Sequence, residues 1–359
     1  MKNNFSYFAL CEKQKMILIT GGTGLVGTHV LYNLCNAGKP VRVLLHTNSN
    51  VKNIEKVFSY YTTDTIKLME NIEWCEADLL DVYSIMEAME GVSEVYHCAA
   101  MVSFEAKDEE EMFKINVEGT ANMVNAAKEK NIKKFLHVSS IATIGRTKNG
   151  EPCTEELFWK SSPENSNYSI SKYAAEREVW RAAEEGLNVV IVNPSLIIGG
   201  GNWQKSSANM FSKGYKGMKF YTDGATGFVD VRDVSALMIK LMESDIVNER
   251  YILNSENITY KYFFDAMHDA FNKPKPSIKA GKMLSGFAWR EEAIRHLLTG
   301  AAPLITKETA RSANRRSFFS NEKIKKTFPD YTFIPVEQSV NDTCKLFLIP
   351  QKGRGYNNK

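Results

Sequence analysis

Tyr168 and Lys172 have the residue types and the spacing of a proton-transfer pair, in the run Tyr-Ser-Ile-Ser-Lys. Residues four apart on a helix lie on one face. A free phenol has a pKa of about 10 and is a poor acid–base group at neutral pH. A neighbouring ammonium group favours the phenolate and lowers that pKa, so the pair predicts acid–base chemistry on a hydroxyl or carbonyl oxygen. By itself, this spacing often occurs by chance at residues on the protein surface.

A glycine-rich turn near the start of the chain gives the pair a context. The run Thr20-Gly-Gly-Thr-Gly-Leu-Val-Gly27 follows a short apolar run and opens a helical pattern. Glycines in that position permit a tight turn and a close approach of the backbone to a pyrophosphate, which predicts a nicotinamide dinucleotide site. An ordinary strand–helix turn is the alternative. The residues expected to contact the cofactor here are Gly21, Thr23, Gly24, Leu25, Val26 and Gly27. Lys172 can also hold the nicotinamide ribose.

The second predicted strand bears on the choice between NAD and NADP. Residues 41–50 contain no acid to bind the ribose hydroxyl of NAD, and His46 stands near the strand end. We therefore expect a preference for NADP over NAD, with a solvated strand-end histidine as the alternative role for His46. Asp78 follows the third strand and is a candidate for the adenine amino group or, alternatively, for an exposed helix N-cap.

Two further polar residues are candidates for the reaction site. Ser140 follows an apolar strand, and its hydroxyl can stabilise negative charge that develops on a substrate oxygen. Ser139 is adjacent and is the alternative candidate for this role. Asn116 lies within a long helical pattern, where an amide slightly disfavours helix; it either holds a water for proton relay or is a helix-face asparagine.

The elements that must position these residues alternate between strand and helix. Six short apolar runs are separated by helical patterns, which predicts a Rossmann-type, doubly wound parallel sheet of the α/β class. The expected strands are 16–20, 41–45, 72–75, 94–100, 134–139 and 188–193. The expected helices include 25–37, 109–130 and 168–185. We expect a cofactor domain over 14–193, a smaller mixed α/β lobe over 194–350 with some chain exchange, and flexible ends at 1–13 and 351–359. Helical patterns in that lobe cover 231–242, 260–272 and 282–298.

Composition excludes several classes of protein. The chain has 359 residues, 43% apolar and 24% charged, with a net charge of +3 that gives no reason to expect nucleic acid. Six cysteines show no metal-type spacing, so reduced thiols and no metal site are expected. No apolar run reaches the roughly 20 residues of a membrane span. We expect a cytoplasmic protein with a small-molecule substrate.

Taken together, the motifs resemble the extended short-chain dehydrogenase/reductase family, also called the NAD-dependent epimerase/dehydratase family. The likeness extends from about residue 15 to about residue 348. Besides the glycine turn and the Tyr168–Lys172 run, it rests on Asp78-Leu79, 97–100, 116–120, 138–140, 193–194 and 228–234. It implies Tyr168 as the acid–base group, Lys172 as its activator, Ser140 as the oxyanion partner and Asn116 as a fourth polar residue. It places Leu79, Ala99, Ala100 and Pro194 beside the cofactor.

Within that family, two departures favour reduction over other chemistries. Nucleotide-sugar epimerases usually show an Arg-Tyr-Phe-Asn-type strand leading to Gly-Pro, whereas residues 190–194 here read Val-Ile-Val-Asn-Pro. Sugar dehydratases usually carry a Thr-Asp-Glu-like triad, whereas Ile141 and Ala142 follow Ser140 here. The segment from Asn193 to Gly199 resembles the dihydroflavonol-reductase and 3β-hydroxysteroid-dehydrogenase branch, although that branch typically has arginine at His46. A small apolar or ring-bearing carbonyl substrate is expected, with a nucleotide-sugar epimerase, a 3β-hydroxysteroid-type dehydrogenase/isomerase and a non-catalytic cofactor sensor as alternatives. The family also makes a homodimer plausible. The candidate pocket residues, several of which could instead fill the core, are Met101, Val102, Phe104, Ile141, Leu196, Trp203 and Phe228.

Overall fold

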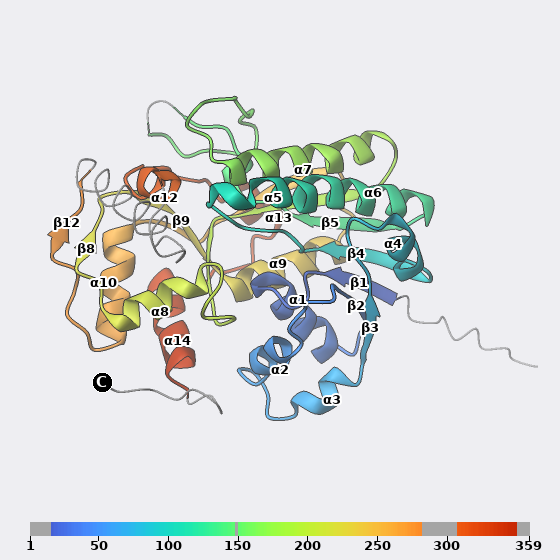
Figure 1. The fold of residues 1–359 in the computed structure, drawn as a ribbon, viewed down its shortest axis with the longest axis horizontal. Coiled ribbons are helices and arrows are strands. Elements are labelled where there is room, and N and C mark those ends of the chain that lie inside the picture. Colours follow the sequence, from blue (N-terminus) through green and yellow to red (C-terminus); the bar gives the residue numbers. More distant parts are fainter. Residues whose placement is uncertain (1–15, 148–149, 282–306, 350–359) are drawn as a thin grey trace, which may run out of the picture.

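Seven parallel strands form the large sheet of this computed structural model, which describes residues 16–147, 150–281 and 307–349 (Figure 1). Their spatial order is β10-β6-β5-β4-β1-β2-β3. The strands are β1 (Met16–Thr20), β2 (Val41–Leu45), β3 (Ile72–Glu76), β4 (Val92–His97), β5 (Lys134–Val138), β6 (Val189–Pro194) and β10 (Glu249–Leu253). The predicted doubly wound parallel sheet is confirmed, and β10 is a strand that the sequence did not reveal.

Helices cover both faces of this sheet because successive strand residues point to opposite sides. Ile17 and Ile19 pack into one apolar cluster, whereas Leu18 packs into the other. The first cluster is covered by α1 (Leu25–Asn36) and α9 (Val231–Glu243). The second is covered by α4 (Val82–Ala88), α6 (Gly119–Glu129) and α7 (Asn167–Glu184). Figure 1 shows α6 and α7 side by side above the sheet.

The long helix expected over 109–130 is divided. It consists of α5 (Glu109–Phe113), a π-helical turn η2 (Lys114–Glu118) and α6. Asn116 lies in the π-helical turn, which adds a residue to the turn and so rotates α5 relative to α6. The remaining short helices of this half are α2 (Lys52–Phe58), α3 (Thr65–Met69), η1 (Ala106–Asp108) and η3 (Ile141–Thr143).

A smaller lobe of mixed helices and short strands contains an aromatic core. Its sheets contain β7 (Leu196–Ile198), β9 (Ala225–Asp230) and β11 (Glu256–Thr259), and separately β8 (Phe220–Tyr221) and β12 (Ile278–Lys279). Its helices are α8 (Ala208–Lys216), α10 (Tyr260–Ala270), α12 (Lys307–Ser312) and α14 (Val336–Leu348), whereas α13 (Glu322–Thr327) packs on β10 of the large sheet. Trp203, Phe211, Phe263 and Phe347 pack together between these helices.

The chain passes between the two parts more than once. Helix α9 and strand β10 follow residue 193 in the chain, yet β10 pairs with β6 in the large sheet. The proposed division at residue 193 stays a prediction. The flexible ends and the helix over 282–298 also stay predictions, because those residues lie outside the part of the chain that the structure describes. Five of the six cysteines are described and are free thiols; Cys11 lies outside the described residues. Among the described helices, none is long and apolar enough to span a membrane.

Candidate active site

The glycine turn between β1 and α1 has the geometry that a dinucleotide phosphate needs. Gly21 has a φ of +68°, and the Gly24 amide donates to the Gly21 carbonyl over 2.9 Å. A Cβ atom on Gly27 would lie 2.3 Å from that same carbonyl oxygen. Helix α1 begins directly after Gly24, and in this described segment no side chain caps it and its first turn carries no acid. Its first amides and positive dipole end therefore suit an anionic phosphate, so the residues present fit the cofactor.

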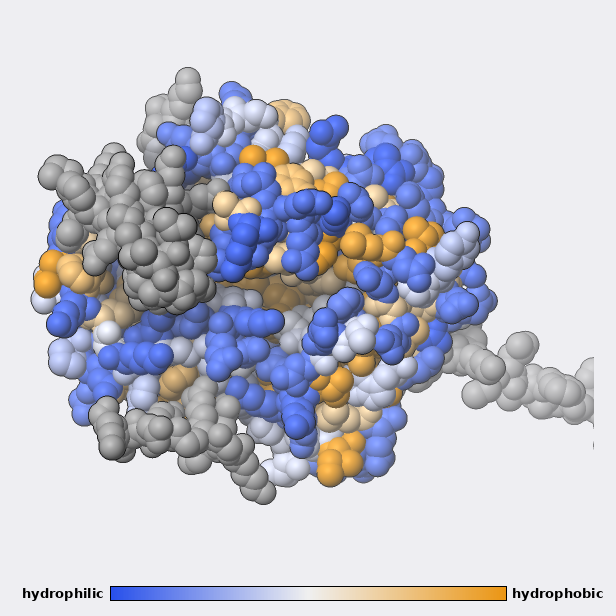
Figure 2. Space-filling view, in the orientation of Figure 1, coloured by the Kyte–Doolittle hydropathy of each residue, from blue (hydrophilic) through white to orange (hydrophobic). Residues whose placement is uncertain are grey.

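The other predicted cofactor residues lie along the same carboxyl edge of the sheet. Thr23, Leu25 and Val26 belong to the turn and the first turn of α1, and Asn53 Nδ2 donates to the Thr23 carbonyl over 2.7 Å. The positions that follow β3, β4 and β6 are occupied by Leu79, Ala99, Ala100 and the strand-end Pro194. Ligands of open α/β sheets bind at this edge. Figure 2 shows this face of the molecule hollowed between α5 and α1, with apolar residues in the hollow.

His46 and Asp78 face one another at the ends of β2 and β3. The His46 Nε2 to Asp78 Oδ2 distance is 3.9 Å, and both side chains are about half exposed. An Asp78 carboxylate oxygen also accepts from the Leu80 amide, as in a turn. A 2′-phosphate near His46 would therefore also meet the Asp78 carboxylate, which would have to move or be screened.

Ser140, Tyr168 and Lys172 come together where β5 meets α7. The Ser140 hydroxyl accepts the Ala142 amide over 3.1 Å as the N-cap of η3, and it is close enough to Tyr168 to lower the pKa of the phenol. Lys172 is buried on the same face of α7 and donates from Nζ to the Val138 carbonyl over 2.8 Å. The three residues thus lie within one turn of helix and the end of one strand, as their spacing predicts.

The protonation of this group is governed mainly by burial. Burial raises the pKa of Tyr168, and the nearby Ser140 hydroxyl offsets part of that rise. Burial lowers the pKa of Lys172 to about 8, against an upward influence of Glu176 and Cys98. The expected lowering of the tyrosine pKa by Lys172 is not seen, because desolvation dominates and the ammonium group points to the Val138 carbonyl.

A buried carboxylate behind the site holds several of its backbone segments. Glu176 lies one turn after Lys172, and its Oε2 accepts from Ser139 Oγ over 2.5 Å and Thr143 Oγ1 over 2.7 Å. The same Oε2 accepts from Asn193 Nδ2 over 2.9 Å. Its Oε1 pairs with the Arg250 guanidinium on β10 over 3.0 Å. The charge is therefore compensated and fully hydrogen-bonded, as a buried carboxylate requires.

Asn116 fixes the loop that follows β4. Its Oδ1 accepts the Met101 amide over 2.7 Å, and its Nδ2 donates to the Met101 carbonyl over 2.9 Å and to Ser171 Oγ over 3.0 Å. Its side chain is buried. These three contacts make Asn116 a positioning residue for Met101 and for α7; its predicted part in a proton relay stays a prediction.

A hydrogen-bonded chain joins the glycine-turn strand to the π-helical turn. Thr20 Oγ1 and His97 Nδ1 are 2.8 Å apart, and His97 Nε2 and Thr120 Oγ1 are 3.1 Å apart. Thr120 donates to the Asn116 carbonyl over 2.6 Å, and Thr20 accepts the Ala99 amide over 3.2 Å. Burial lowers the pKa of His97 to about 3. The neutral ring with its proton on Nε2 satisfies every donor and acceptor of this chain.

The predicted pocket residues separate into two groups. Near the site, Phe104 packs edge to face on Tyr168 with centroids 5.7 Å apart, Val102 is exposed beside it, and Ile141 follows Ser140. Leu196, Trp203 and Phe228 instead belong to the aromatic core of the smaller lobe. Trp203 and Phe228 are buried there by other aromatic rings, so the structure does not bring them to Tyr168.

Glu176 and Arg250 were not found from the sequence. Glu176 follows Lys172 by four residues on one helix, and that signal was available. Arg250 lies 74 residues further along the chain, and only the pairing of β10 with β6 brings it here. Within the described ranges, the structure groups no three His, Cys, Asp or Glu residues in a way that would hold a metal.

Comparisons with known proteins agree with this geometry. The model of the NAD dependent epimerase/dehydratase family matches residues 17–253. The sterol demethylase protein B of Methylococcus capsulatus is 29% identical over 265 residues, 73% of this chain and 76% of that protein. A putative dihydroflavonol 4-reductase of Synechocystis is 28% identical over 312 residues, covering 85% of this chain and 87% of that protein.

Solved structures show the same architecture. The crystal structure of gox2253 superposes with a TM-score of 0.77 at 30% identity, over 93% of this chain and 98% of that one. The UDP-glucose 4-epimerase of Thermus thermophilus, solved with NAD, gives a TM-score of 0.70 at 19% identity over 92% of this chain and 98% of that one. At that identity, the second likeness concerns the fold alone.

Proposed function

The chain belongs to the NAD-dependent epimerase/dehydratase family, and from that premise we propose that it reduces a carbonyl group, or oxidises the corresponding alcohol, with Tyr168 as the acid–base residue. It is an NAD(P)-dependent oxidoreductase of the extended short-chain type. The observation that carries the proposal is that Tyr168 and Lys172 share one face of α7, with Ser140 close enough to Tyr168 to lower the pKa of its phenol. A nicotinamide cofactor whose pyrophosphate is held at the glycine turn would supply or accept the hydride.

Each side chain has a distinct part in this reaction. Tyr168 gives its proton to the substrate oxygen during reduction and takes it back during oxidation. Ser140 donates a hydrogen bond to the same oxygen and steadies the charge that develops there. Lys172 holds a positive charge one turn away and, through Val138, keeps α7 against the end of β5. Asn116 and Glu176 position these groups through the contacts described above.

Two observations favour a reductase over an epimerase. The relatives matched by sequence include named reductases, among them the dihydroflavonol reductase of Synechocystis and a cinnamoyl-CoA reductase of Petunia hybrida. Strand β6, which begins at Val189, reads Val-Val-Ile-Val-Asn-Pro rather than the Arg-Tyr-Phe-Asn type usual in sugar-nucleotide epimerases. An epimerase would retain tightly bound NAD and show no net redox change. A non-catalytic sensor would bind the cofactor and turn over no carbonyl.

The finer choices of cofactor and assembly are part of the proposal. His46 supports a preference for NADP over NAD, whereas the Asp78 carboxylate beside it would repel a 2′-phosphate. Separate titrations with NADPH and NADH measure which cofactor binds more tightly. A homodimer through α5, α6 and α7 is the assembly we propose. Sedimentation equilibrium measures whether the chain forms that dimer.

The Tyr168→Phe variant tests the mechanism. We expect it to lower turnover of ketones and aldehydes by at least about two orders of magnitude, because it removes the transferable proton. NADPH binding, followed by fluorescence titration, should survive. Tyr173→Phe is a matched control on the same helix, because Tyr173 stacks on Trp159 instead, with ring centroids 4.6 Å apart. Equal turnover in Tyr168→Phe and the unmodified protein would refute the mechanism.

A further inference from the structure

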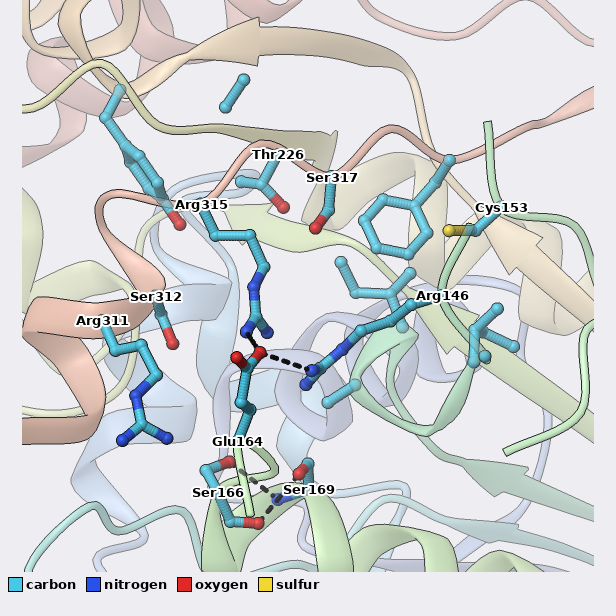
Figure 3. Close-up of a pocket in the computed structure, with 17 residues that line it drawn as sticks. Arg146, Cys153, Glu164, Ser166, Ser169, Thr226, Arg311, Ser312, Arg315 and Ser317 are labelled. Carbon is cyan, nitrogen blue, oxygen red and sulfur yellow. Dashed lines mark hydrogen bonds and ion pairs between the residues drawn. The ribbon is translucent and has the colours of Figure 1, made fainter. Parts of the chain in front are cut away.

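A cavity of about 180 Å³ lies beside the proposed reaction site (Figure 3). Its walls come from Ile141 and Arg146 after β5, from Ser166 and Ser169 at the start of α7, and from the C-terminal segment 311–319. Ile141 directly follows Ser140, and Ser169 directly follows Tyr168. Ala142, whose amide donates to the Ser140 hydroxyl, also lines the cavity, so a group seated there would lie close to the proposed reaction site.

We propose that this cavity binds an anionic group, a carboxylate or a phosphate, carried by the carbonyl substrate. This inference names the substrate class for the site and so rests on the proposed function. It replaces the expectation of a small apolar or ring-bearing carbonyl substrate with that of a molecule that has an uncharged carbonyl end and a negatively charged end.

The charge of the cavity carries the inference. Three guanidinium groups line it, from Arg146, Arg311 and Arg315, and Glu164 is the one carboxylate among its described lining residues. Arg315 pairs with Glu164, and Arg146 Nη1 lies 3.6 Å from Glu164 Oε2. Arg311 donates instead to the Pro163 carbonyl over 3.2 Å. Three cations against one carboxylate leave an excess of positive charge at one place.

The arginines are close enough to disfavour one another. Burial lowers the pKa of Arg146, and the charges of Arg315 and Arg311 lower it further, while Glu164 opposes this. Figure 3 shows Arg146 and Arg315 reaching Glu164 from different segments, with Arg311 on the adjacent α12. A ligand anion would relieve this repulsion. Planar guanidinium groups match the paired oxygens of a carboxylate or a phosphate.

A purely structural role would not explain why three arginines line the cavity. The Arg315–Glu164–Arg146 contact ties the C-terminal segment to the loop before α7, and one arginine would suffice for that tie. The first turn of α7, an 18-residue helix, adds a partial positive charge on the same side. The remaining wall is apolar at Ile141, Ala225 and Phe319, which suits the carbon skeleton between the two ends of the substrate.

Binding measurements test the anion site without turnover. Inorganic phosphate and benzoate are titrated by calorimetry at constant ionic strength and saturating NADPH, which keeps the glycine turn filled. We expect saturable binding of at least one anion, weakened about tenfold in Arg311→Gln because a charge-assisted hydrogen bond is lost. Glu164→Gln should bind more tightly, since it removes the competing carboxylate.

Arg316→Gln is the matched control for these titrations. Arg316 neighbours Arg315 in the chain, but its Nε donates to the Asp223 carbonyl over 3.0 Å and it does not line the cavity. The control should bind the anion as the unmodified protein does. Absence of saturable binding of both anions, equal affinity in Arg311→Gln, or the same loss in Arg316→Gln would overturn the proposal.

Turnover then tests whether the site serves the substrate. Two pairs of probes differ mainly in charge: succinic semialdehyde against butanal, and glyceraldehyde 3-phosphate against glyceraldehyde. We expect a higher kcat/KM for the anionic member of at least one pair, with that preference reduced in Arg311→Gln and kept in Arg316→Gln. A preference for the neutral members would overturn the proposal. Intact anion binding with no carbonyl turned over would count against the proposed function and leave the anion site standing.

Discussion

At the scale of single residues, the charge of Lys172 depends on a neighbour that touches no substrate. Burial brings the pKa of Lys172 down to about 8, and Glu176 acts in the opposite direction. Lys172 therefore loses its proton at a pH only slightly above the physiological range. Alkaline conditions should discharge Lys172 and slow the reaction, which gives the pH profile of kcat a falling limb near pH 8.

Glu176→Gln should move that falling limb to lower pH. Removing a negative charge that favours the ammonium form lowers the pKa of Lys172, and the unpaired Arg250 charge acts in the same direction. The measurement is the pH dependence of kcat, with Glu178→Gln as control, since Glu178 pairs with Arg181 on the outer side of α7. An unchanged limb, or one displaced to higher pH, would show that Glu176 does not set this charge.

The sequence could reveal the residues of this group but not their partners. Ser140, Tyr168 and Lys172 follow from spacing and order along the chain. The choice between neighbouring serines needed coordinates: Ser140 lies close enough to Tyr168 to lower its pKa, whereas Ser139 donates to Glu176. Trp203 shows a different limit of sequence analysis. A hydrophobic core and an apolar pocket use the same residue types, and the structure places Trp203 in the core.

At the scale of elements, β1, the glycine turn and α1 act as one rigid unit. Gly27→Ala should disrupt it, because the added Cβ would lie 2.3 Å from the Gly21 carbonyl oxygen and backbone must move. We expect a loss of about 1–3 kcal/mol in the free energy of unfolding and much weaker NADPH binding. Chemical denaturation and fluorescence titration measure the two effects.

Gly38→Asn is the control for that substitution. Gly38 ends the same helix with a φ of +70° and open space around the Cβ position, and asparagine tolerates this conformation. This variant should bind NADPH normally. If Gly27→Ala also bound NADPH normally, the close contact within the turn would not be a requirement of the site.

Element boundaries were predictable where they depend on local pattern and not where they depend on distant contacts. The six strands up to Pro194 lie close to the expected positions. The π-helical turn was not predicted because Asn116 makes its contacts with Met101 and Ser171, which lie 15 and 55 residues away. Strand β10 was missed because Glu249 and Arg250 begin it with polar residues at the edge of the sheet.

At the scale of the whole molecule, the C-terminal segment is anchored to the large domain through α9. The Tyr331 hydroxyl donates to Asp233 Oδ1 over 2.8 Å, and the Ile334 amide donates to Oδ2 over 3.0 Å. Nearby, Arg232 bridges Asp230 and Asp342. Burial nevertheless raises the pKa of Asp233 to about 6, so this anchor contains a carboxyl group that folding makes harder to ionise.

This raised pKa predicts a pH dependence of stability. Between about pH 4 and pH 6 the folded protein holds a proton on Asp233 that the unfolded chain has lost, so the free energy of unfolding falls as pH rises. Relative to Asp233→Asn, the unmodified protein should lose up to about 3 kcal/mol across that window. Denaturation at several pH values measures the difference.

Tyr331→Phe provides a second measurement with a definite sign. The Tyr331 hydroxyl lowers the pKa of Asp233, so its removal should raise that pKa and extend the fall in stability to higher pH. A difference between the unmodified protein and Asp233→Asn that stays flat from pH 4 to pH 7 would contradict the assignment. Movement of the Tyr331→Phe profile to lower pH would contradict it as well.

The origin of the cavity wall has a consequence for how this enzyme can change. Arg311 and Arg315 belong to a C-terminal stretch held by backbone hydrogen bonds of Arg315 and Ser317 to Ala225, whereas Lys172 donates to the Val138 carbonyl and Glu176 holds Ser139, the neighbour of Ser140. These two sets of supports share no residue. The part of the cavity wall that carries Arg311 and Arg315 can therefore be altered without touching the supports of the reacting groups, so substitutions there offer a way to change substrate selectivity separately from the chemistry.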